Sequence, residues 1–211
     1  MNASLQIFID QVLLDFDGIP PERKETLNDI SKMISGRLVL GENANLTFIC
    51  THNSRRSHMS QVWAETAAFY YGIDKVFTYS GGTNETACNI RTIQALQRAG
   101  FSVSDSTFGD NPVYLIQYSD KRPPIKAYSK LYNHGDNPQE EFIALMCCSK
   151  ADMQCPVVQG ASSRFAIHYE DPKECDDTTE ETEVYDERCR EIAREMFYIM
   201  SMVNLQNGTG I

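Results

Sequence analysis

The chain has 211 residues, of which 42% are hydrophobic and 23% are charged, so it can bury a core and is not an intrinsically disordered chain. With 29 acidic and 19 basic residues its formal net charge is -10, which argues against general affinity for nucleic acid or anionic membranes. We therefore expect no nucleic-acid partner and no membrane association.

The N-terminal residues predict two helices. Over residues 4–16 apolar side chains recur at helical spacing, and Gly18 with the two prolines after it ends the pattern. The apolar positions are Leu5, Phe8, Ile9, Val12 and Leu13. Acidic residues interrupt this segment, so we do not expect it to be a signal peptide. A second amphipathic helix is expected over about 21–37.

The rest of the chain alternates between predicted strands and predicted helices. Residues 46–50 predict a buried strand, and residues 57–72 predict a helix that ends at its last glycine. Such alternation is typical of a parallel sheet with helices on both faces. The polar stretch 119–139 contains prolines, asparagines and a glycine and is expected to be an insertion. Further strands are expected at 75–80, 112–119, 141–148 and 164–170, and further helices at 90–98 and 178–203.

The stretch CTHNSRRS, residues 50–57, places a cysteine, an arginine and a serine where a strand is expected to give way to a helix. In open α/β sheets, ligands bind at this end of the strands. Loop amides and the helix dipole attract a tetrahedral oxyanion there, and Arg56 can add two parallel hydrogen bonds. The same positive field favours the thiolate form of Cys50, which makes it a candidate nucleophile. Ser57 is expected to hold the loop by hydrogen bonding, and Asn53 to support a strained turn.

The alternative is that Cys50 is a core residue and Arg56 follows it by chance, because a cysteine that ends a strand is usually buried. The strand, loop and helix around the two residues, and the serine directly after the arginine, favour the anion site. The residues expected to hold the anion are Thr51, His52, Asn53, Ser54, Arg55, Arg56 and Ser57.

The stretch CTHNSRRS resembles the phosphate-binding loop of low-molecular-weight protein tyrosine phosphatases and of the thioredoxin-coupled arsenate reductases that share their fold. Residues 80–101, SGGTNETACNIRTIQALQRAGF, resemble the strand, loop and helix that follow in this family. The resemblance spans about residues 45–200 and implies a doubly wound α/β fold with a four-stranded parallel sheet. It divides the chain into a helical N-terminal extension, 1–40, and a phosphatase-like α/β domain, 41–211. One position departs from the family pattern, because His52 stands where glycine is common, and its effect on the loop is open.

Splitting a phosphate ester or an arsenate requires a proton for the departing oxygen, which a nearby carboxylic acid can supply. The resemblance implies that Asp171, which precedes Pro172, is this general acid. Asp-Pro is also a common turn dipeptide, and Glu170 is a neighbouring alternative. Lys173 and Glu174 follow where tyrosine phosphatases typically have aromatic residues, which argues against phosphotyrosine as the substrate.

The segment LMCCSKADMQCP places Cys148 and Cys155 after an expected strand and in an expected loop, with six residues between them. It resembles the redox segment of the thioredoxin-coupled arsenate reductases. The resemblance implies a relay in which Cys148 attacks Cys50, Cys155 resolves that disulfide, and thioredoxin reduces the pair that forms. This relay requires the segment around Cys148 to move. The alternative is that Cys147 and Cys148 are packed hydrophobic side chains at the end of a strand.

Seven cysteines at uneven spacing are typical of a reducing compartment, so we expect the protein in the cytoplasm. The sequence contains no C-x-x-C pair, and Cys175, Cys189 and His168 do not complete a familiar zinc-ligand spacing. We therefore expect no metal and no other cofactor.

Three functions are open on the sequence. The resemblance favours an arsenate reductase coupled to a thioredoxin-like reductant. The second is a phosphatase that hydrolyses phosphotyrosine or another phosphomonoester through a phosphocysteine and needs no relay. The third is a non-catalytic anion-binding or adaptor protein. For the first function the catalytic residues are Cys50, Arg56, Asp171, Cys148 and Cys155.

Overall fold

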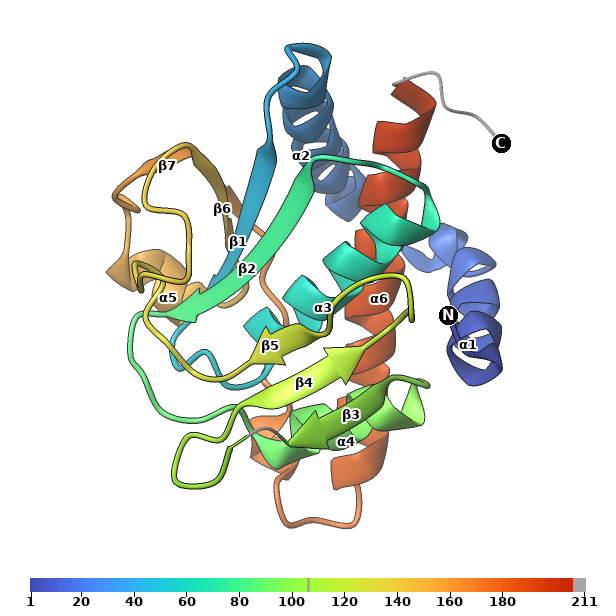
Figure 1. Ribbon diagram of the computed structural model, residues 1–211, viewed down its shortest axis with the longest axis vertical. Coiled ribbons are helices and arrows are strands. Elements are labelled where there is room, and N and C mark those ends of the chain that lie inside the picture. The colour runs from blue at the N-terminus through green and yellow to red at the C-terminus, as the bar shows by residue number, and fades with distance from the viewer. Residues whose placement is uncertain (106, 207–211) are drawn as a thin grey trace.

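Four parallel strands form the central sheet of the protein, whose computed structural model describes residues 1–105 and 107–206. The strands are β1 (Ala44–Cys50), β2 (Val76–Gly82), β6 (Phe142–Met146) and β7 (Ala161–Ala166). Their order is β2, β1, β6, β7, and every neighbouring pair is parallel (Figure 1). The two middle strands, β1 and β6, are buried almost throughout, as a sheet covered on both faces requires. The expected four-stranded parallel sheet is confirmed.

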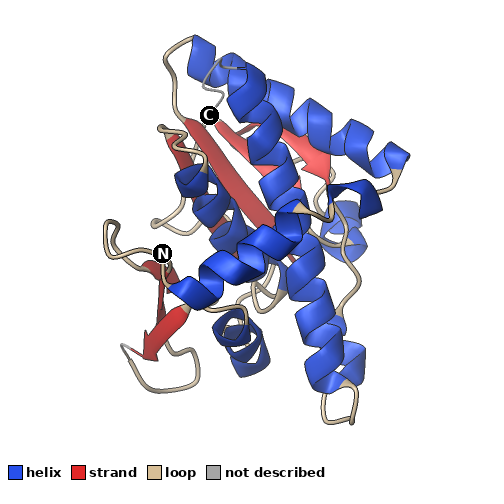
Figure 2. Ribbon diagram, turned by 90° about the vertical axis from the view of Figure 1, so that its right-hand side faces the viewer, coloured by secondary structure: helices blue, strands red, loops and turns tan. Residues whose placement is uncertain are grey.

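Helices flank this sheet, and the longest of them, α6 (Glu181–Gln206), contacts most of the others. The remaining helices are α1 (Ala3–Leu13), α2 (Pro21–Val39), α3 (Arg56–Tyr70), α4 (Ile90–Arg98) and α5 (Ser149–Gln154), with 3-10 turns η1 (Phe16–Gly18) and η2 (Pro172–Cys175). α6 packs against α1, α2, α3 and α4, and these helices lie together on one side of the sheet (Figure 2). The helices expected from the sequence are found within a few residues of their predicted ends.

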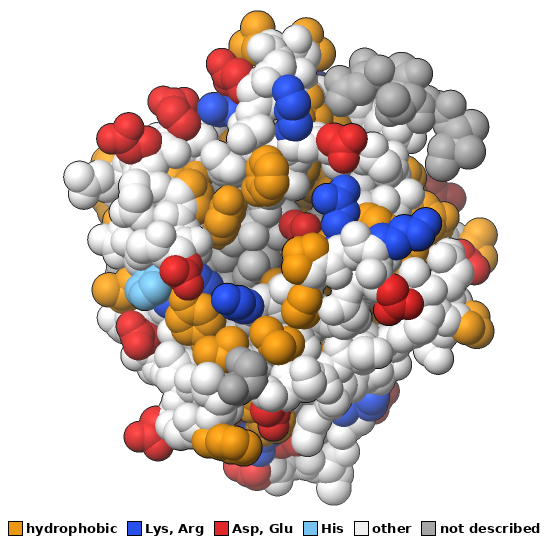
Figure 3. Space-filling view, in the orientation of Figure 1, with side chains coloured by type: hydrophobic (Ala, Val, Ile, Leu, Met, Phe, Trp, Pro, Cys, Tyr) orange, Lys and Arg blue, Asp and Glu red, His pale blue; other side chains and the backbone are white. Residues whose placement is uncertain are grey.

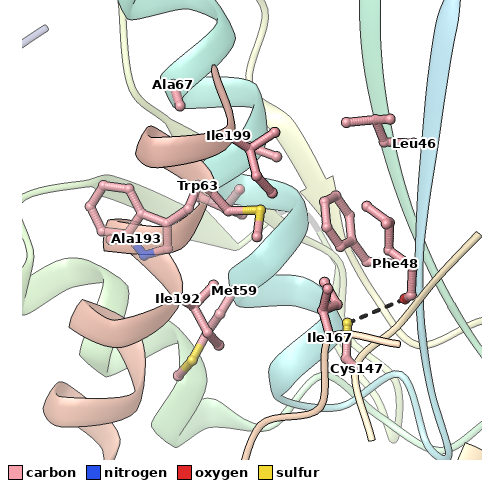
Figure 4. Packing of buried hydrophobic residues seen from close by; sticks show 14 of the residues in the cluster. Leu46, Phe48, Met59, Trp63, Ala67, Cys147, Ile167, Ile192, Ala193 and Ile199 are labelled. Atoms are coloured by element: carbon pink, nitrogen blue, oxygen red, sulfur yellow. Dashed lines mark hydrogen bonds between the residues drawn. The ribbon is translucent and has the colours of Figure 1, made fainter. Parts of the chain in front are cut away.

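Side chains from α3, α6 and the sheet form the core between these layers. Met59 and Trp63, four residues apart on one face of α3, lie beside Ile192 and Ala193 of α6 (Figure 4). Phe48 of β1 fills the core on the sheet side (Figure 4). All five side chains are fully buried. Burial of each large side chain stabilises the fold by roughly 1.5–3 kcal/mol, so α3, which begins at the candidate loop, is firmly anchored.

A second, antiparallel sheet consists of β3 (Ser102–Asp105), β4 (Tyr114–Gln117) and β5 (Ile125–Ala127). The strand expected at 112–119 is present as β4, and it pairs in this second sheet and not in the parallel one. The connections on both sides of β4 are too short for a crossover helix, which parallel pairing requires. The second sheet begins before the insertion predicted at 119–139, and the bounds of that insertion stay a prediction.

The N-terminal extension predicted at 1–40 contains α1, η1 and α2, and both helices pack on α6. Phe8 of α1 stacks on Trp63 with the ring centroids 5.2 Å apart, so this segment shares the main core. The division at residue 40 stays a prediction, and residues 106 and 207–211 of the predicted domain lie outside the described residues. Among the helices of the described chain, none combines the length and the hydropathy that a membrane span needs.

Candidate active site

The carboxyl end of β1 and the N-terminus of α3 enclose a short loop, residues 51–55. β1 ends at Cys50 and α3 begins at Arg56, as the sequence predicts. Asn53 turns the loop in the left-handed region with a φ of 44°, which is the strained turn expected there. Gly82, at the end of β2, lies against the loop so closely that a Cβ would stand 2.9 Å from the Asn53 nitrogen. The glycine therefore allows β2 to support the loop.

Hydrogen bonds from outside the loop hold its carbonyl groups. The Thr51 carbonyl oxygen accepts the Asn84 amide at 2.8 Å, and the His52 carbonyl oxygen accepts Ser129 Oγ at 2.8 Å. Because these carbonyl oxygens are bonded to groups outside the loop, the backbone amides are the groups that remain to line its centre. The N-terminus of α3 has no side-chain cap to compete for its amides. Such a loop is suited to bind an oxyanion.

Cys50 lies at the base of this loop, 3% exposed, with its Sγ 3.1 Å from Ser57 Oγ. Asn53 Nδ2 donates to the same serine oxygen at 2.9 Å, and Asn53 Oδ1 accepts the Lys130 amide at 3.0 Å. Because the serine oxygen already accepts one hydrogen bond, its own proton is available to the Cys50 sulfur. A hydroxyl donor at this position stabilises the thiolate.

Arg56 connects the loop to the segment that carries Asp171. Its Nη1 donates to the Tyr169 carbonyl oxygen at 2.9 Å, and its Nη2 donates to Asp171 Oδ2 at 2.5 Å. Its Nε is buried and has no acceptor among the described residues, so this donor remains for an anion in the loop. Cys50, Arg56 and Asp171 line one small pocket.

Asp171, and not the neighbouring Glu170, contributes to that pocket. The Asp171 side chain caps η2, where its Oδ1 accepts the Lys173 amide at 3.2 Å. It is one-third exposed, so it contacts both Arg56 and solvent. Glu170 is exposed. This geometry suits a general acid at Asp171.

Arg55 and His52 are two of the loop residues that were expected to hold the anion. The Arg55 guanidinium donates to Tyr185 Oη at 2.6 Å and to Asp176 at 2.8 Å, so its charge is paired outside the loop centre. His52 is exposed, and its φ is not positive, so a side chain replaces the usual glycine there without strain. Partial burial, followed by the charge of Lys150, lowers the pKa of His52, which leaves the ring neutral at pH 7.

Tyr169, whose carbonyl group holds Arg56, is itself fixed by a buried ion pair. Its hydroxyl donates to Glu195 of α6 at 2.6 Å, and Arg23 of α2 donates to the same carboxylate through two nitrogens at 2.8 Å. The Arg23 guanidinium lies 5.0 Å from the centre of the Tyr169 ring. Glu195 is 2% exposed, and burial raises the pKa of Tyr169, which therefore stays a proton donor. The N-terminal helix α2 thus supports the segment that leads to Asp171.

Cys148 lies beside the loop, and a helix separates it from Cys155. Cys148 Sγ is 3.4 Å from Thr51 Oγ1, and as the N-cap of α5 it accepts the Ala151 amide at 3.4 Å. Cys155 is the C-cap of the same helix and is half-buried. The expectation of a loop between the two cysteines is wrong. A six-residue helix is too short to show a periodic pattern in the sequence.

This helix keeps the two relay candidates apart. At 1.5 Å per residue, seven steps separate Cys148 from Cys155 by about 10 Å, whereas a disulfide needs Cα atoms within about 7 Å. A Cys148–Cys155 disulfide therefore requires α5 to unwind. Cys147 is fully buried, and burial raises the pKa of its thiol, so it packs as a hydrophobic side chain. Within the described part of the chain, no three potential metal ligands lie together.

No family model matches the chain. The arsenate reductase of Bacillus subtilis is 27% identical over 150 residues, which cover 71% of this chain and 89% of that protein. The arsenate reductase of Halalkalibacterium halodurans is 25% identical over 134 residues, which cover 64% and 78%.

Solved structures extend the comparison. The low-molecular-weight protein tyrosine phosphatase of T. tengcongensis superposes with a TM-score of 0.51 at 15% identity, covering 75% of this chain and 99% of that one. The corresponding phosphatase of Vibrio cholerae O395 has a TM-score of 0.50 at 14% identity, covering 80% and 100%. The chain has the low-molecular-weight phosphatase fold.

Within this phosphatase fold, the sequence pointed to the loop and the acid but missed their supports. Arg23 and Glu195 are 172 positions apart, so no local pattern joins them. Lys130, whose amide holds Asn53, lies within the stretch 119–139 that was expected to be only a polar insertion. The supporting role of these residues can be recognised only in the folded structure, where residues distant in the sequence come into contact.

Proposed function

We propose that this protein is an arsenate reductase that uses a cysteine nucleophile and a thiol relay. One observation carries the proposal: Cys148 Sγ lies 3.4 Å from Thr51, the residue next to the nucleophile Cys50. Hydrolysis of a phosphate ester needs no second thiol beside the loop, whereas reduction of arsenate does. The similarity to the arsenate reductases of Bacillus subtilis and Halalkalibacterium halodurans supports the same reaction.

In the first step, arsenate takes hydrogen bonds from the loop amides and from Arg56 Nε. As the arsenate oxygens engage the guanidinium, Asp171 is released from its ion pair and takes up a proton. The Cys50 thiolate attacks arsenic, one As–O bond breaks, and Asp171 protonates the departing hydroxide to water. The product is a covalent Cys50 adduct in which arsenic is still As(V).

In the second step, the Cys148 thiolate attacks the Cys50 sulfur. The electron pair of the S–As bond passes to arsenic, which leaves as arsenite, As(III), and a Cys50–Cys148 disulfide forms. Cys155 then attacks the Cys148 sulfur, and Cys50 leaves as a thiolate. Arsenic gains the two electrons that the thiols lose, and an external dithiol restores them. The last exchange needs α5 to unwind, because its two ends must meet.

We infer that the dithiol is a thioredoxin-like protein that approaches Cys155. Met153 and Val157, on either side of this cysteine, are 75% and 81% exposed. Exposed apolar side chains around a reactive thiol are typical of a docking surface. All seven cysteines are free, which favours the reducing environment of the cytoplasm.

A phosphatase is the second candidate, because Cys50, Arg56 and Asp171 alone suffice to hydrolyse a phosphomonoester. The arrangement of these three side chains around one pocket supports it. Among the described residues that line this pocket there is no phenylalanine, tyrosine or tryptophan to grip an aromatic ester. A phosphotyrosine substrate is therefore disfavoured.

Replacement of the second thiol separates the two functions. Cys148→Ser should abolish thioredoxin-dependent arsenate turnover and leave any hydrolysis of p-nitrophenyl phosphate intact. Cys147→Ser, which removes the adjacent buried thiol, is the matched control and should keep arsenate turnover. Survival of arsenate turnover in Cys148→Ser would exclude the relay. Loss of arsenate turnover in Cys147→Ser, with the fold preserved, would show that the assignment of the relay to Cys148 is wrong.

A further inference from the structure

A cavity away from Cys50 lies between β2 and the second sheet. Its volume is about 440 Å³, which lies in the range of small-molecule sites. Figure 3 shows the hollow on this face, with hydrophobic and charged side chains at its rim. It shares no lining residue with the pocket above Cys50. The proposed function does not use it.

A buried cation forms part of the cavity lining. Lys130 is 4% exposed, and its ammonium lies 4.6 Å from the centre of the Tyr128 ring. Among the described residues, no carboxylate lies within the 4.0 Å of an ion pair with it. Burial lowers the pKa of Lys130 to about 8, so most molecules still carry this charge at pH 7. Asp136 attracts this ammonium from beyond ion-pair distance. A buried ammonium without a direct ion pair is still costly, and an anionic ligand group would relieve that cost.

The same cavity also carries negative charge. Glu65 of α3 and Asp136 belong to its lining. The hydroxyl of Tyr128 donates to Asp136, and this hydrogen bond lowers the pKa of the Asp136 carboxyl, which is therefore ionised at pH 7. A ligand that is only an anion would be repelled by these two carboxylates. A ligand with one negative and one positive group suits both sets of charges.

Two buried amide oxygens add to the demand for hydrogen-bond donors. Gln61 Oε1 and Asn137 Oδ1 are buried without a partner among the described residues, and both residues line the cavity. Their amide nitrogens are already engaged, with the Thr78 carbonyl at 3.1 Å and the Ser80 carbonyl at 3.0 Å. The orientation of both amides is thereby determined, and the oxygens lack donors.

The outer wall of the cavity is apolar. Phe77 of β2 is 44% exposed, and Pro123, Pro124 and Ile125 also line the cavity. We propose that this cavity binds a free α-amino acid with an apolar or aromatic side chain. Its carboxylate pairs with Lys130, its ammonium lies on the side of the carboxylates, and its side chain packs on the wall around Phe77.

L-Phenylalanine is the probe that tests this site, in ligand-observed NMR and chemical-shift titrations of the full chain. For a ligand of this size we expect a dissociation constant on the order of 1 mM or tighter. Phenethylamine lacks the carboxylate and 3-phenylpropionate lacks the ammonium. Each should bind roughly tenfold more weakly or worse, because each leaves one charge of the cavity unpaired. Equal binding of either compound would overturn the assignment, as would the absence of saturable binding of L-phenylalanine.

Variants locate the binding. Phe77→Ala should weaken L-phenylalanine binding severalfold, whereas Phe108→Ala, which removes an aromatic ring that is 96% exposed and outside the cavity, should not. Lys130→Met should abolish binding, with circular dichroism to verify the fold. Asp136→Asn, at an exposed position, tests the ammonium side if Lys130→Met does not fold. Binding unchanged in Phe77→Ala and in Asp136→Asn would place the ligand elsewhere and refute the site.

Discussion

Arg23 is predicted to stabilise both the fold and the position of Arg56, although it lies in the N-terminal helix α2. Its two hydrogen bonds to Glu195 neutralise a carboxylate that is only 2% exposed. Arg23→Met leaves that charge buried and unpaired, which costs about 3–5 kcal/mol of the free energy of unfolding. Without Arg23, the Glu195 carboxylate that accepts the Tyr169 hydroxyl is no longer held in position. Tyr169 can then shift, and its carbonyl group no longer holds Arg56 in place. We expect arsenate turnover to fall about tenfold, which corresponds to ~1.4 kcal/mol in the barrier.

Urea unfolding at neutral pH and steady-state arsenate kinetics measure these two effects. Lys32→Met is the matched control, because it removes a cation from an exposed ion pair on the same helix and should cost less than about 1 kcal/mol. Arg23→Met combined with Glu195→Leu should recover stability, since no buried charge remains, but not turnover. If Arg23→Met were no more destabilising than Lys32→Met, the reasoning about the buried ion pair would be refuted.

Three further predictions concern the loop and its surroundings. Burial is the larger cause, and the positive charge of Lys130 the smaller one, that lowers the pKa of His58 from 6.5 to about 3. Below pH 6.5 the unfolded chain therefore binds a proton at His58 that the folded chain does not. Stability should therefore fall as the pH drops from 6.5 towards 3, by about 2 kcal/mol at pH 5, and His58→Gln should remove this part of the decline in urea titrations. Asp171→Asn should lower arsenate turnover by roughly 10²–10⁴, measured by arsenite release, because the general acid is lost. Gly82→Ala places a Cβ 2.9 Å from the loop backbone. It should lower the free energy of unfolding by about 1–3 kcal/mol, measured by thermal or urea unfolding, and should also lower arsenate turnover.

Each of these has an outcome that contradicts it. A decline of stability with acid that is identical in His58→Gln would show that other groups carry it. Unchanged turnover in Asp171→Asn would leave the proton to another donor, with Glu170 as the next candidate. Gly82→Ala with normal stability and turnover would show that β2 does not constrain the loop.

The elements that the sequence predicted well carry long or strongly patterned signals. The alternation of apolar strands with amphipathic helices predicts the parallel sheet, and the spacing of Cys50 and Arg56 identifies the loop. The missed elements are short: α5 has six residues and β5 has three. Their form depends on caps and pairing partners, such as the Cys148 thiol that accepts the Ala151 amide, and a single sequence does not display these contacts.

The position of the relay thiols shows the same limit. Six residues between Cys148 and Cys155 are compatible with a loop that brings the sulfurs together or with a helix that holds them apart. The structure has the helix, so the resemblance named the candidate thiols, but their spacing did not show that a helix between them would have to unwind. The N-terminal helices are similar, because their apolar stripes predict burial but not which surface they cover.

The most direct test of the account is a single turnover of Cys155→Ser with arsenate in the absence of any external reductant. Without the resolving thiol the relay should stop at its first disulfide. We predict one arsenite released per protein molecule and a Cys50–Cys148 disulfide in the peptide map. Release of arsenite with no such disulfide, or no release at all from a folded protein, would contradict the proposed chemistry at Cys50.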